Sequence, residues 1–551
     1  MPDDRRRLLP DAGAIAILAV LPLVLYRGVL SLWWSHDDFY QLRFITQYHA
    51  WQYTLRPEVW HLLPNGMFTP LLFVSLELDR ALFGVAPRAF YLHHLLDVDL
   101  AFLALYALLR QWLPVGWAGF GTALALVGTP VALSLQMLMT RHYLEGLLPA
   151  TLSVLLFVRA EASPRSRALW ASSVLYFLAM LAKEIFVPLP GLLFFLAPGR
   201  AAERLRRLLP HLVALAAYLA YRGYLVEQPF RTYGWAAEAA DLPRLALALP
   251  GKIGRLIFGG MSPAGLLLAL GLGVSLAGMA RFGRRGIVLC IAGVGVALLP
   301  ILPVSTQLEP RFALASWLLL AVAAAFGGWA LSQGSVSRSR LVLGLAVLIS
   351  LTALAVNRQV WAASLPLAER AGTEARSLLD LPAGAYLRQP AMPPSALHAL
   401  PLFRTAVLHR PADMGGWFAD DLFLSRLPPG ARLFQYATKA RAVEEVTGRS
   451  QALGEAFRAA LRPGAPLYVE LRYARSSLRW RLGPYETGRY WFLFDGGMDA
   501  VEIPPTGGYR RPAGSHFAVC VRYQSPEGWN TYSPELTLDL EEGRQAEFRR
   551  P

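Results

Sequence analysis

Long apolar runs recur along the first two thirds of the chain, and they constrain its fold more than any other feature. About 20 apolar residues suffice to cross the hydrocarbon core of a bilayer as a helix. The hydrophobic share of 55%, against 17% charged residues, also exceeds what a soluble domain carries. The sequence therefore excludes a soluble enzyme and predicts a polytopic α-helical membrane protein with about eleven transmembrane helices. The expected spans lie near residues 12–32, 90–109, 115–138, 143–158, 168–182, 186–198, 209–226, 263–280, 287–304, 312–331 and 341–357.

Arginine residues mark alternate links between these spans. The first span follows Arg5–Arg7 without a small-residue cleavage site, so we expect a retained signal anchor. Cytoplasmic loops are enriched in Lys and Arg, which predicts a cytoplasmic N-terminus and an extracytoplasmic region after Asn357. If the short runs around Lys183 and Glu184 form one bent segment, all later assignments invert. The other basic links hold Arg110, Arg159–Arg167, Arg200–Arg207, Arg281–Arg285 and Arg338–Arg340.

The basic surplus, 53 Lys+Arg against 38 Asp+Glu, forms no dense tract and no nucleic-acid motif. We therefore expect membrane lipids and no nucleic acid as partners. Cys290 and Cys520 are the only cysteines and offer neither a disulfide framework nor a CxxC metal site. Lysine occurs only at positions 183, 252 and 439 beside abundant arginine, which indicates a GC-rich bacterial genome. We expect the protein to be integral to the cytoplasmic (inner) membrane.

Two outer segments are too polar to span a membrane. The first, from about Ser35 to Arg88, carries many aromatic and leucine side chains, and the second runs from about Glu227 to Ser262. Amphipathic helices with aromatic belts settle at the headgroup level. The sequence therefore predicts interfacial helices in the first outer loop.

The composition becomes rich in Pro and Arg after Asn357. From Leu467 to Ala474 and from Phe517 to Tyr523, apolar and polar residues alternate between Gly, Pro and Asn turns. Such runs predict a small antiparallel β-sandwich, which either selects an acceptor or only stabilises the protein. The predicted parts are a transmembrane domain over residues 1–357, an extracytoplasmic linker or mixed region over 358–464, and a β-sandwich-like extracytoplasmic domain over 465–551.

Asp37 and Asp38 follow the outer end of the first span, in the segment SHDDFYQLRF. Two adjacent carboxylates repel one another. A bound cation, a nearby arginine or a catalytic proton transfer would each account for them. The structural alternative is an N-cap for the helix that follows, since Asp is a good capping residue.

His93, His94 and Asp97 form a second cluster, at the outer end of the second span. Helical spacing allows Asp97 to pair with either histidine. Ionisable groups within a span usually face a cavity or a partner. A metal ligand set and an internal hydrogen bond are both compatible with these residues.

Acids, imidazoles and cations from separate stretches reach the same outer membrane height in this topology. Taken singly, each has a structural explanation such as a surface ion pair or an arginine at the membrane boundary. Together they predict a site, and its cations suit a phosphate group. The residues are Arg141, His142, Glu145, Lys183, Glu184, Arg222, Glu309 and Arg311.

The acid pair, the segment PLLFVSLELDRALFGVAPRAFYLHHLL and the later MLAKEIFVPLP together resemble the GT-C type membrane glycosyltransferases. This class includes the protein O-mannosyltransferases (family 39-like) and the aminoarabinose transferase of lipid A. The resemblance covers residues 12–200 well and residues 209–357 by hydropathy alone. It implies an enzyme that uses a polyprenyl-phosphate-linked sugar as donor, on the extracytoplasmic face. The acceptor would be a lipid, a glycan or a protein.

The resemblance also implies roles for the candidate residues. Asp37 or Asp38 would be the catalytic acid, with Asp38 the first choice as general base and the order left open. The base would take a proton from an acceptor hydroxyl, which attacks the anomeric carbon with inversion. A divalent metal ion bridging Asp37 and the phosphate is an optional cofactor. Arg311, Lys183 and Arg141 would bind the donor phosphate, and His93, His94, Asp97, His142, Glu145 and Glu184 would line the pocket.

Other classes share this hydropathy. Transporters and flippases commonly show paired repeats with sites at the midplane, and the sequence contains no such repeat. A polysaccharide ligase would need the arginines but not the two aspartates. A polytopic protein of envelope assembly would function without Asp37 and Asp38.

Overall fold

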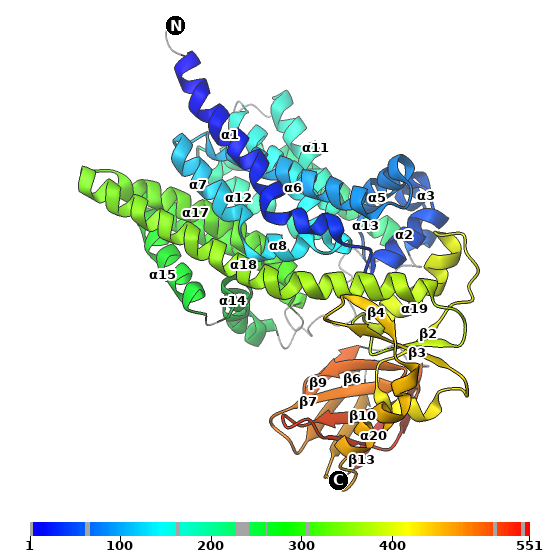
Figure 1. Ribbon diagram of the computed structural model, residues 1–551. Helices are drawn as coiled ribbons and strands as arrows, with labels where there is room; N and C mark the ends of the chain where they lie inside the picture. Colours follow the sequence, from blue (N-terminus) through cyan, green and yellow to red (C-terminus); the bar gives the residue numbers. More distant parts are fainter. Residues whose placement is uncertain are drawn as a thin grey trace. The chain divides into compact units, whose positions relative to one another are not determined.

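The computed structural model contains two compact units (Figure 1). The helical unit comprises Met1–Leu32 and Ile45–Pro366, and the mixed unit comprises Trp33–Phe44 and Leu367–Pro551. Part of the first outer loop therefore groups with the C-terminal region. The domain boundaries after residues 357 and 464 stay predictions. The structure describes residues 4–60, 67–160, 166–226, 242–260, 262–304, 308–474, 477–510, 515–540 and 546–550.

Helices build the helical unit. The first half contains α1 (Asp4–Tyr26), α3 (Ala50–Leu55), α4 (Pro57–Trp60), α5 (Pro70–Phe83), α6 (Pro87–Leu109), α7 (Val115–Leu126), α8 (Thr129–Leu135), α9 (Arg141–Glu145) and α10 (Leu147–Arg159). The second half contains α11 (Arg167–Ala182), α12 (Leu189–Leu196), α13 (Ala201–Val226), α14 (Leu242–Phe258), α15 (Pro263–Ala277), α16 (Gly283–Leu298), α17 (Leu314–Ser332) and most of α18 (Val336–Asp380).

Five helical segments among the described residues are long and apolar enough to cross a membrane. A sixth results if α7 and α8, which are bent by 52° at their junction, count as one span. The prediction of a helical membrane protein is confirmed, whereas the number eleven stays a prediction. Helices α10, α11 and α12 have only 13, 16 and 8 residues, less than a full crossing needs. The five segments are Asp11–Ser31, Pro87–Leu109, Pro263–Leu302, Pro310–Ser332 and Val336–Asp380.

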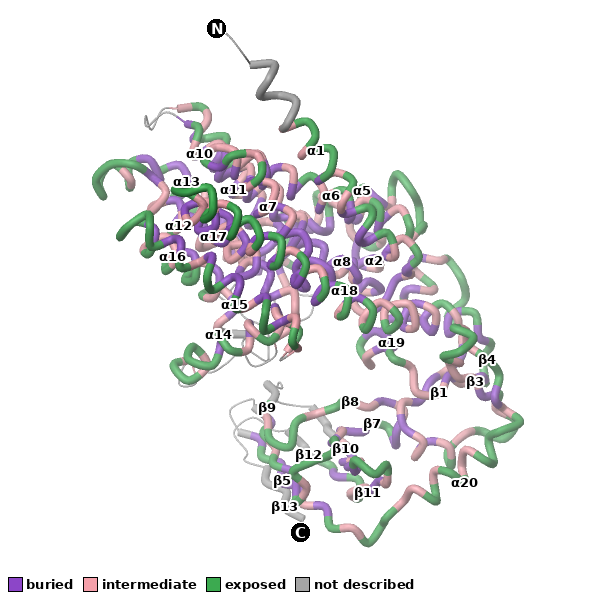
Figure 2. Tube along the Cα trace, turned by 60° about the vertical axis from the view of Figure 1, so that its left-hand side comes forward, coloured by how far each residue is buried: buried purple, intermediate pink, exposed green. Residues whose placement is uncertain are grey.

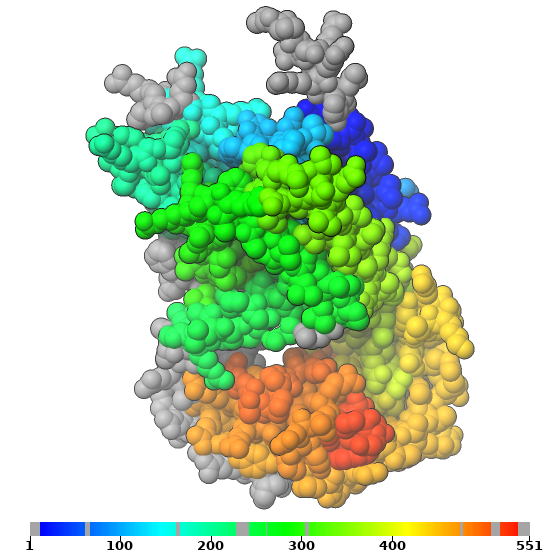
Figure 3. Space-filling view, turned by 90° about the vertical axis from the view of Figure 1, so that its left-hand side faces the viewer, coloured from blue at the N-terminus to red at the C-terminus, as the bar shows by residue number. Residues whose placement is uncertain are grey.

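Large apolar side chains stay exposed on these segments, among them Ile17 on α1, Leu270 on α15 and Leu341 on α18. Exposed residues are green along the trace in Figure 2. Figure 3 shows a face on which the green segments of the helical unit form much of the surface. In a bilayer such side chains face lipid, so their exposure agrees with an integral membrane protein.

The predicted interfacial segment does contain short helices, α2 (Asp38–Gln47) to α5. Most of its aromatic side chains, however, are buried inside the protein. Tyr53, Phe68 and Phe73 are each 0% exposed, and the Trp60 indole donates a hydrogen bond to the Tyr53 carbonyl at 2.6 Å. Trp51 is exposed. The second outer segment lies mostly outside the described residues, which resume at residue 242.

Three sheets occur in the described part of the mixed unit. In the first, β1 (Ala385–Arg388) pairs in parallel with β2 (Gly416–Phe418) and β3 (Arg432–Ala437), and β4 (Ala442–Glu445) pairs antiparallel to β3. One antiparallel sheet contains β5 (Tyr468–Ala474), β6 (Ser477–Gly483), β9 (Thr506–Arg510) and β13 (Ala546–Arg550). The other contains β7 (Arg489–Phe494), β8 (Asp499–Ile503), β10 (Ser515–Gln524), β11 (Asn530–Tyr532) and β12 (Leu536–Leu540).

The two antiparallel sheets share one apolar core. Val469 and Leu471 of β5 and Phe492 and Val521 of the other sheet belong to the same buried cluster. Alternate residues of a strand point to one face, so the alternation in the sequence produces this core. The prediction of a β-rich C-terminal domain is confirmed. Residues 358–464 also contain the first sheet and two helices, α19 (Pro394–Ala406) and α20 (Ser450–Ala460).

Candidate active site

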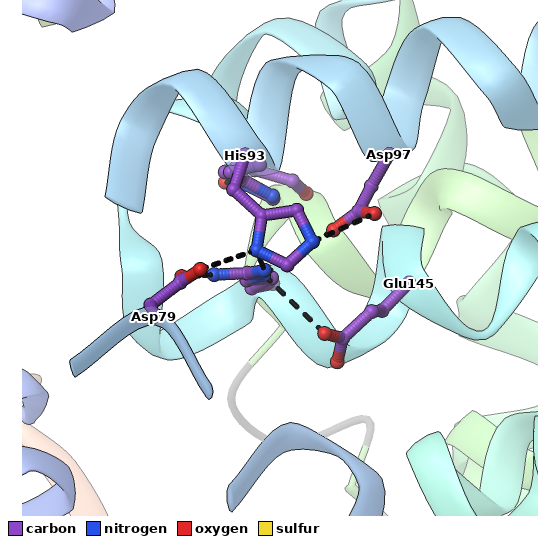
Figure 4. A network of polar contacts seen from close by, with 7 residues as sticks. Asp79, His93, Asp97 and Glu145 are labelled. Carbon is purple, nitrogen blue, oxygen red and sulfur yellow. Dashed lines mark hydrogen bonds and ion pairs between the residues drawn. The ribbon is translucent and has the colours of Figure 1, made fainter. Parts of the chain in front are cut away.

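A network of charged side chains connects α5, α6 and α9 (Figure 4). Asp79 Oδ1 lies 2.5 Å from His93 Nδ1, and Asp79 Oδ2 lies 2.5 Å from Arg141 Nη1. Arg141 Nε lies 3.3 Å from Asp97 Oδ2 and 3.3 Å from Glu145 Oε1. His93 Nε2 lies 3.5 Å from Asp97 Oδ1. We call these five residues the carboxylate network.

Local sequence signals place these residues. Pro70 and Pro87 stand in the first turns of α5 and α6, where a missing N–H costs nothing. Gly84 ends α5 with φ +63°, a conformation that favours glycine. His93 and Asp97 are four residues apart on α6 and therefore share one face, and the two α9 residues of the network have the same spacing.

Arg141 is enclosed by this network. Its side chain is 0% exposed and that of Asp79 is 1% exposed. A buried charge is tolerated only when it is paired and hydrogen-bonded, and here one guanidinium holds three carboxylates together. Glu145 Oε2 is buried without a hydrogen-bond partner among the described residues. The Arg141 guanidinium is therefore paired with the carboxylates of Asp79, Asp97 and Glu145.

A second set of residues in the helical unit carries positive charge. Lys183 follows α11, Arg222 lies on α13, and Arg311 lies in the 3-10 helix η8 (Pro310–Ala313). The charges of Lys183 and Arg311 both act on the buried His142 imidazole. The charges of Lys183 and Arg222 both act on the Glu184 carboxylate. We call Lys183, Arg222 and Arg311 the cation group.

Each member of the cation group also has protein partners. Lys183 Nζ lies 2.8 Å from Glu184 and 5.5 Å from the centre of the Tyr143 ring. Arg311 Nη1 lies 2.8 Å from Glu309, whose side chain is 46% exposed. Arg222 lies over the Phe68 ring at 5.4 Å. Cation–π contacts with aromatic rings and the ion pair with the half-exposed Glu309 carboxylate are therefore among the interactions of these cations.

Asp37 and Asp38 belong to the mixed unit; Asp37 lies in a tight turn, and Asp38 is the first residue of α2. The Asp38 carboxylate accepts a hydrogen bond from the Ser35 amide at 2.9 Å, and Asp38 is 2% exposed. Asp37 is partly exposed. Burial and the negative charge of Asp37 raise the pKa of the Tyr40 phenol. Of the two acids, Asp37 is therefore the more accessible, and Asp38 stabilises the turn.

The structure thus brings together four of the predicted residues, His93, Asp97, Arg141 and Glu145. His94, which follows His93 on α6, is 0% exposed, and its Nε2 lies 3.2 Å from the Ser134 carbonyl oxygen of α8. Asp79 was not predicted. Its signal was available, because the stretch LELDR places Glu77, Asp79 and Arg80 on a largely apolar helix near the predicted site.

A metal site is not evident in the described part of the chain, where no group of three or more His, Cys, Asp or Glu side chains is arranged to hold an ion. The carboxylate network has the acids for one, but the Arg141 guanidinium occupies its centre. A role of Asp37 as metal ligand stays a prediction.

Comparison with known families gives a match over residues 68–222, to the family described as dolichyl-phosphate-mannose-protein mannosyltransferase. The resemblance to GT-C membrane glycosyltransferases is confirmed. The expectation of a glycosyltransferase is confirmed with it. The matched segment contains the whole carboxylate network together with Lys183 and Arg222. None of the curated proteins matches the chain significantly.

Three solved structures are similar to this chain at low sequence identity and with TM-scores below 0.5. The ArnT of Cupriavidus metallidurans bound to undecaprenyl phosphate is 14% identical with a TM-score of 0.46, over 78% of this chain and 94% of that one. The Archaeoglobus fulgidus oligosaccharyltransferase in the apo form is 11% identical with a TM-score of 0.45, over 92% and 76%. The mycobacterial arabinofuranosyltransferase AftD is 14% identical with a TM-score of 0.42, over 92% and 40%.

Proposed function

We propose that this GT-C glycosyltransferase moves a sugar from a polyprenyl-phosphate donor to an acceptor hydroxyl, with inversion, on the extracytoplasmic face of the inner membrane. The observation that supports this most is the position of the family match. A family defined by a dolichyl-phosphate-linked sugar matches the segment that contains the carboxylate network and two residues of the cation group.

The cation group is the proposed donor-phosphate site. The group supplies three positive charges: Lys183 pairs with Glu184, Arg311 pairs with Glu309, and Arg222 lies over the Phe68 ring. Fixed cations stabilise the negative charge that develops on a departing phosphate. Arg141, which the sequence also suggested for this role, instead holds Asp79, Asp97 and Glu145 together in our proposal, because it is 0% exposed and paired with all three.

The acid turn supplies the general base. We assign this role to Asp37, since Asp38 is buried and accepts a hydrogen bond from its own turn. Asp37 takes the proton of the acceptor hydroxyl, and the hydroxyl oxygen bonds to the anomeric carbon. The bond from that carbon to the phosphate oxygen breaks, and its electron pair leaves with the polyprenyl phosphate. No step is assigned to a metal ion.

Mass spectrometry of lipids that copurify with the full-length protein in detergent tests the donor site. Wild type and Asp37→Asn should retain a polyprenyl-phosphate sugar, which the Lys183→Gln/Arg311→Gln double variant should lose. Lys252→Gln, a cation outside the group, is the control. If no sample contains a polyprenyl species, the transporter and assembly alternatives are favoured.

The release of undecaprenyl phosphate from a membrane lipid extract tests the chemistry. Asp37→Asn should abolish release at unchanged thermal stability, and Asp38→Asn should lower both. If both single variants and the Asp37→Asn/Asp38→Asn double variant release the lipid at the wild-type rate, a ligase that depends on cations alone replaces our proposal.

A further inference from the structure

The turn that carries Asp37 and Asp38 contacts helix α19 of the C-terminal region through aromatic rings. The Phe403 ring lies 6.2 Å from Trp33, 5.5 Å from Trp34 and 5.2 Å from Phe39, measured between ring centres. Phe403 and Phe39 are each 0% exposed, and Trp34 is 1% exposed. Two of these rings precede the acids and one follows them, so a single side chain contacts both sides of the turn.

Helix α18 also lies close to this segment, at a position where its residue, Gly372, has no side chain. A Cβ atom added at Gly372 would lie 3.0 Å from Trp33 Cβ and 3.3 Å from the Trp33 backbone nitrogen. Few real Cβ atoms approach their neighbours so closely, and backbone atoms cannot turn aside as a side chain can. Glycine at position 372 therefore allows the turn to lie directly on α18.

The backbone of the turn is strained at one residue and needs the surrounding protein to hold it. His36, between the aromatic pair and the acids, has φ +52°, in the left-handed region that non-glycine residues rarely adopt. Such a residue costs about 1–3 kcal/mol and persists only when its surroundings hold it. The hydrogen bond from Ser35 N to Asp38 Oδ2 closes the turn, and the three rings on Phe403 pack around it.

We infer that Phe403 is a positioning residue: it holds the acid turn in the geometry that the transfer reaction needs, although it touches neither donor nor acceptor. The C-terminal region thereby contributes to the reaction through the shape of the first outer loop. This inference rests on the proposed function, in which Asp37 is the general base. Under this inference α19 positions the acid turn, which is a different role from recognising an acceptor or stabilising the fold in general.

The test compares full-length variants in lipid nanodiscs, with undecaprenyl phosphate release from a membrane lipid extract as the readout. Phe403→Ala should lower the maximal rate on the order of 100-fold, because a displacement of about 1 Å has such effects. The extract concentration that gives half of this rate should stay within about twofold, since the cation group is unchanged. Phe403→Leu, which keeps an apolar side chain at this site, should restore much of the rate.

Phe418→Ala is the matched control. Phe418 is also 0% exposed and lies in the mixed unit, but its core cluster contains Phe423, Leu433 and Val446 instead of the acid turn. It should lose comparable stability with a much smaller loss of rate per folded molecule. Gly372→Ala is a second probe that opens no cavity, and it should lower the maximal rate as Phe403→Ala does.

Equal losses of rate in Phe403→Ala and Phe418→Ala at equal folded fractions would overturn the positioning role. So would a loss of copurified donor lipid in step with the rate, because this indicates general unfolding. Asp37→Asn separates this result from a failure of the proposed function. If that variant is fully active, the base assignment fails whatever Phe403 does, and if it is inactive, the Phe403 comparison tests positioning alone.

Discussion

Arg141 shows how the surroundings of one side chain decide its role. Arginine near a membrane surface suits a phosphate group, and the sequence offers several. This guanidinium, however, bonds Asp79 and pairs with Asp97 and Glu145 at 0% exposure. Arg311 differs, because its partner Glu309 is 46% exposed and remains hydrated. Removing the charge of Arg141 should therefore lower the stability of the protein more than removing the charge of Arg311.

We expect Arg141→Gln to destabilise the protein by about 3–5 kcal/mol, because it leaves buried carboxylates without their partner. Arg311→Gln, the control, should cost about 0–1 kcal/mol while weakening retention of the donor lipid. Thermal unfolding in detergent measures the first quantity and lipid mass spectrometry the second. Adding Asp79→Asn to Arg141→Gln should recover part of the stability, since it removes one uncompensated charge. Equal stability losses in the two arginine variants would contradict this assignment.

Glycines set the approach of two apolar helices. A Cβ atom at Gly327 of α17 would lie 1.9 Å from the Ser275 carbonyl oxygen of α15, and one at Gly278 would lie 2.2 Å from the Gly327 carbonyl oxygen. Small residues let helices in membranes pack backbone to backbone, where lipid offers no hydrophobic drive for association. The α15–α17 contact thus depends on the absence of side chains at these positions.

Gly327→Ala should therefore destabilise the protein by about 1–3 kcal/mol through overpacking. Gly273→Ala on α15 is the control, because a Cβ atom there would have nothing within 4 Å among the described residues. Its effect should be neutral or slightly stabilising, since alanine is the better helix former. The comparison needs only thermal unfolding of the two variants in the same detergent. A lower melting temperature for Gly273→Ala than for Gly327→Ala would refute the packing explanation.

The alternation of apolar and polar residues made some elements predictable from the sequence, whereas other features had no such pattern. The alternation around Val469 and Leu471 predicted a strand that the structure contains as β5. The buried face of the first outer loop was missed, because aromatic residues such as Trp60 suit a membrane surface and a protein core equally in sequence. The contact of Phe403 with Phe39 was invisible for another reason, since no local pattern links residues so distant along a chain.

In the molecule as a whole, α18 is the longest helix among the described residues. It contains 45 residues, which corresponds to about 68 Å of helix at 1.5 Å per residue. The hydrocarbon core of a bilayer is only about 30 Å thick. Arg338 and Arg340 lie in the first turns of this helix, and β1 follows its other end in the sequence. A helix of this length can cross the bilayer and continue beyond it.

We expect a membrane-impermeant maleimide to label Ser450→Cys in intact cells and Ser337→Cys only after permeabilisation. Both positions are exposed in the structure. The native background should be low, because burial raises the pKa of the Cys520 thiol to about 11 and leaves it protonated at neutral pH. Labelling of Ser337→Cys alone in intact cells would invert the proposed orientation, as a single bent segment around Lys183 would also require.

The contact between Phe39 and Phe403 has a consequence for biosynthesis. Ribosomes add about 5–20 residues per second, so the acid turn leaves the ribosome on the order of tens of seconds before α19 exists. During this interval the chain already carries both aspartates but lacks the ring that holds them. A truncated product that stops before residue 394 would therefore insert into the membrane without becoming active. Catalytic competence would arise only after α19, which ends at Ala406, has been synthesised.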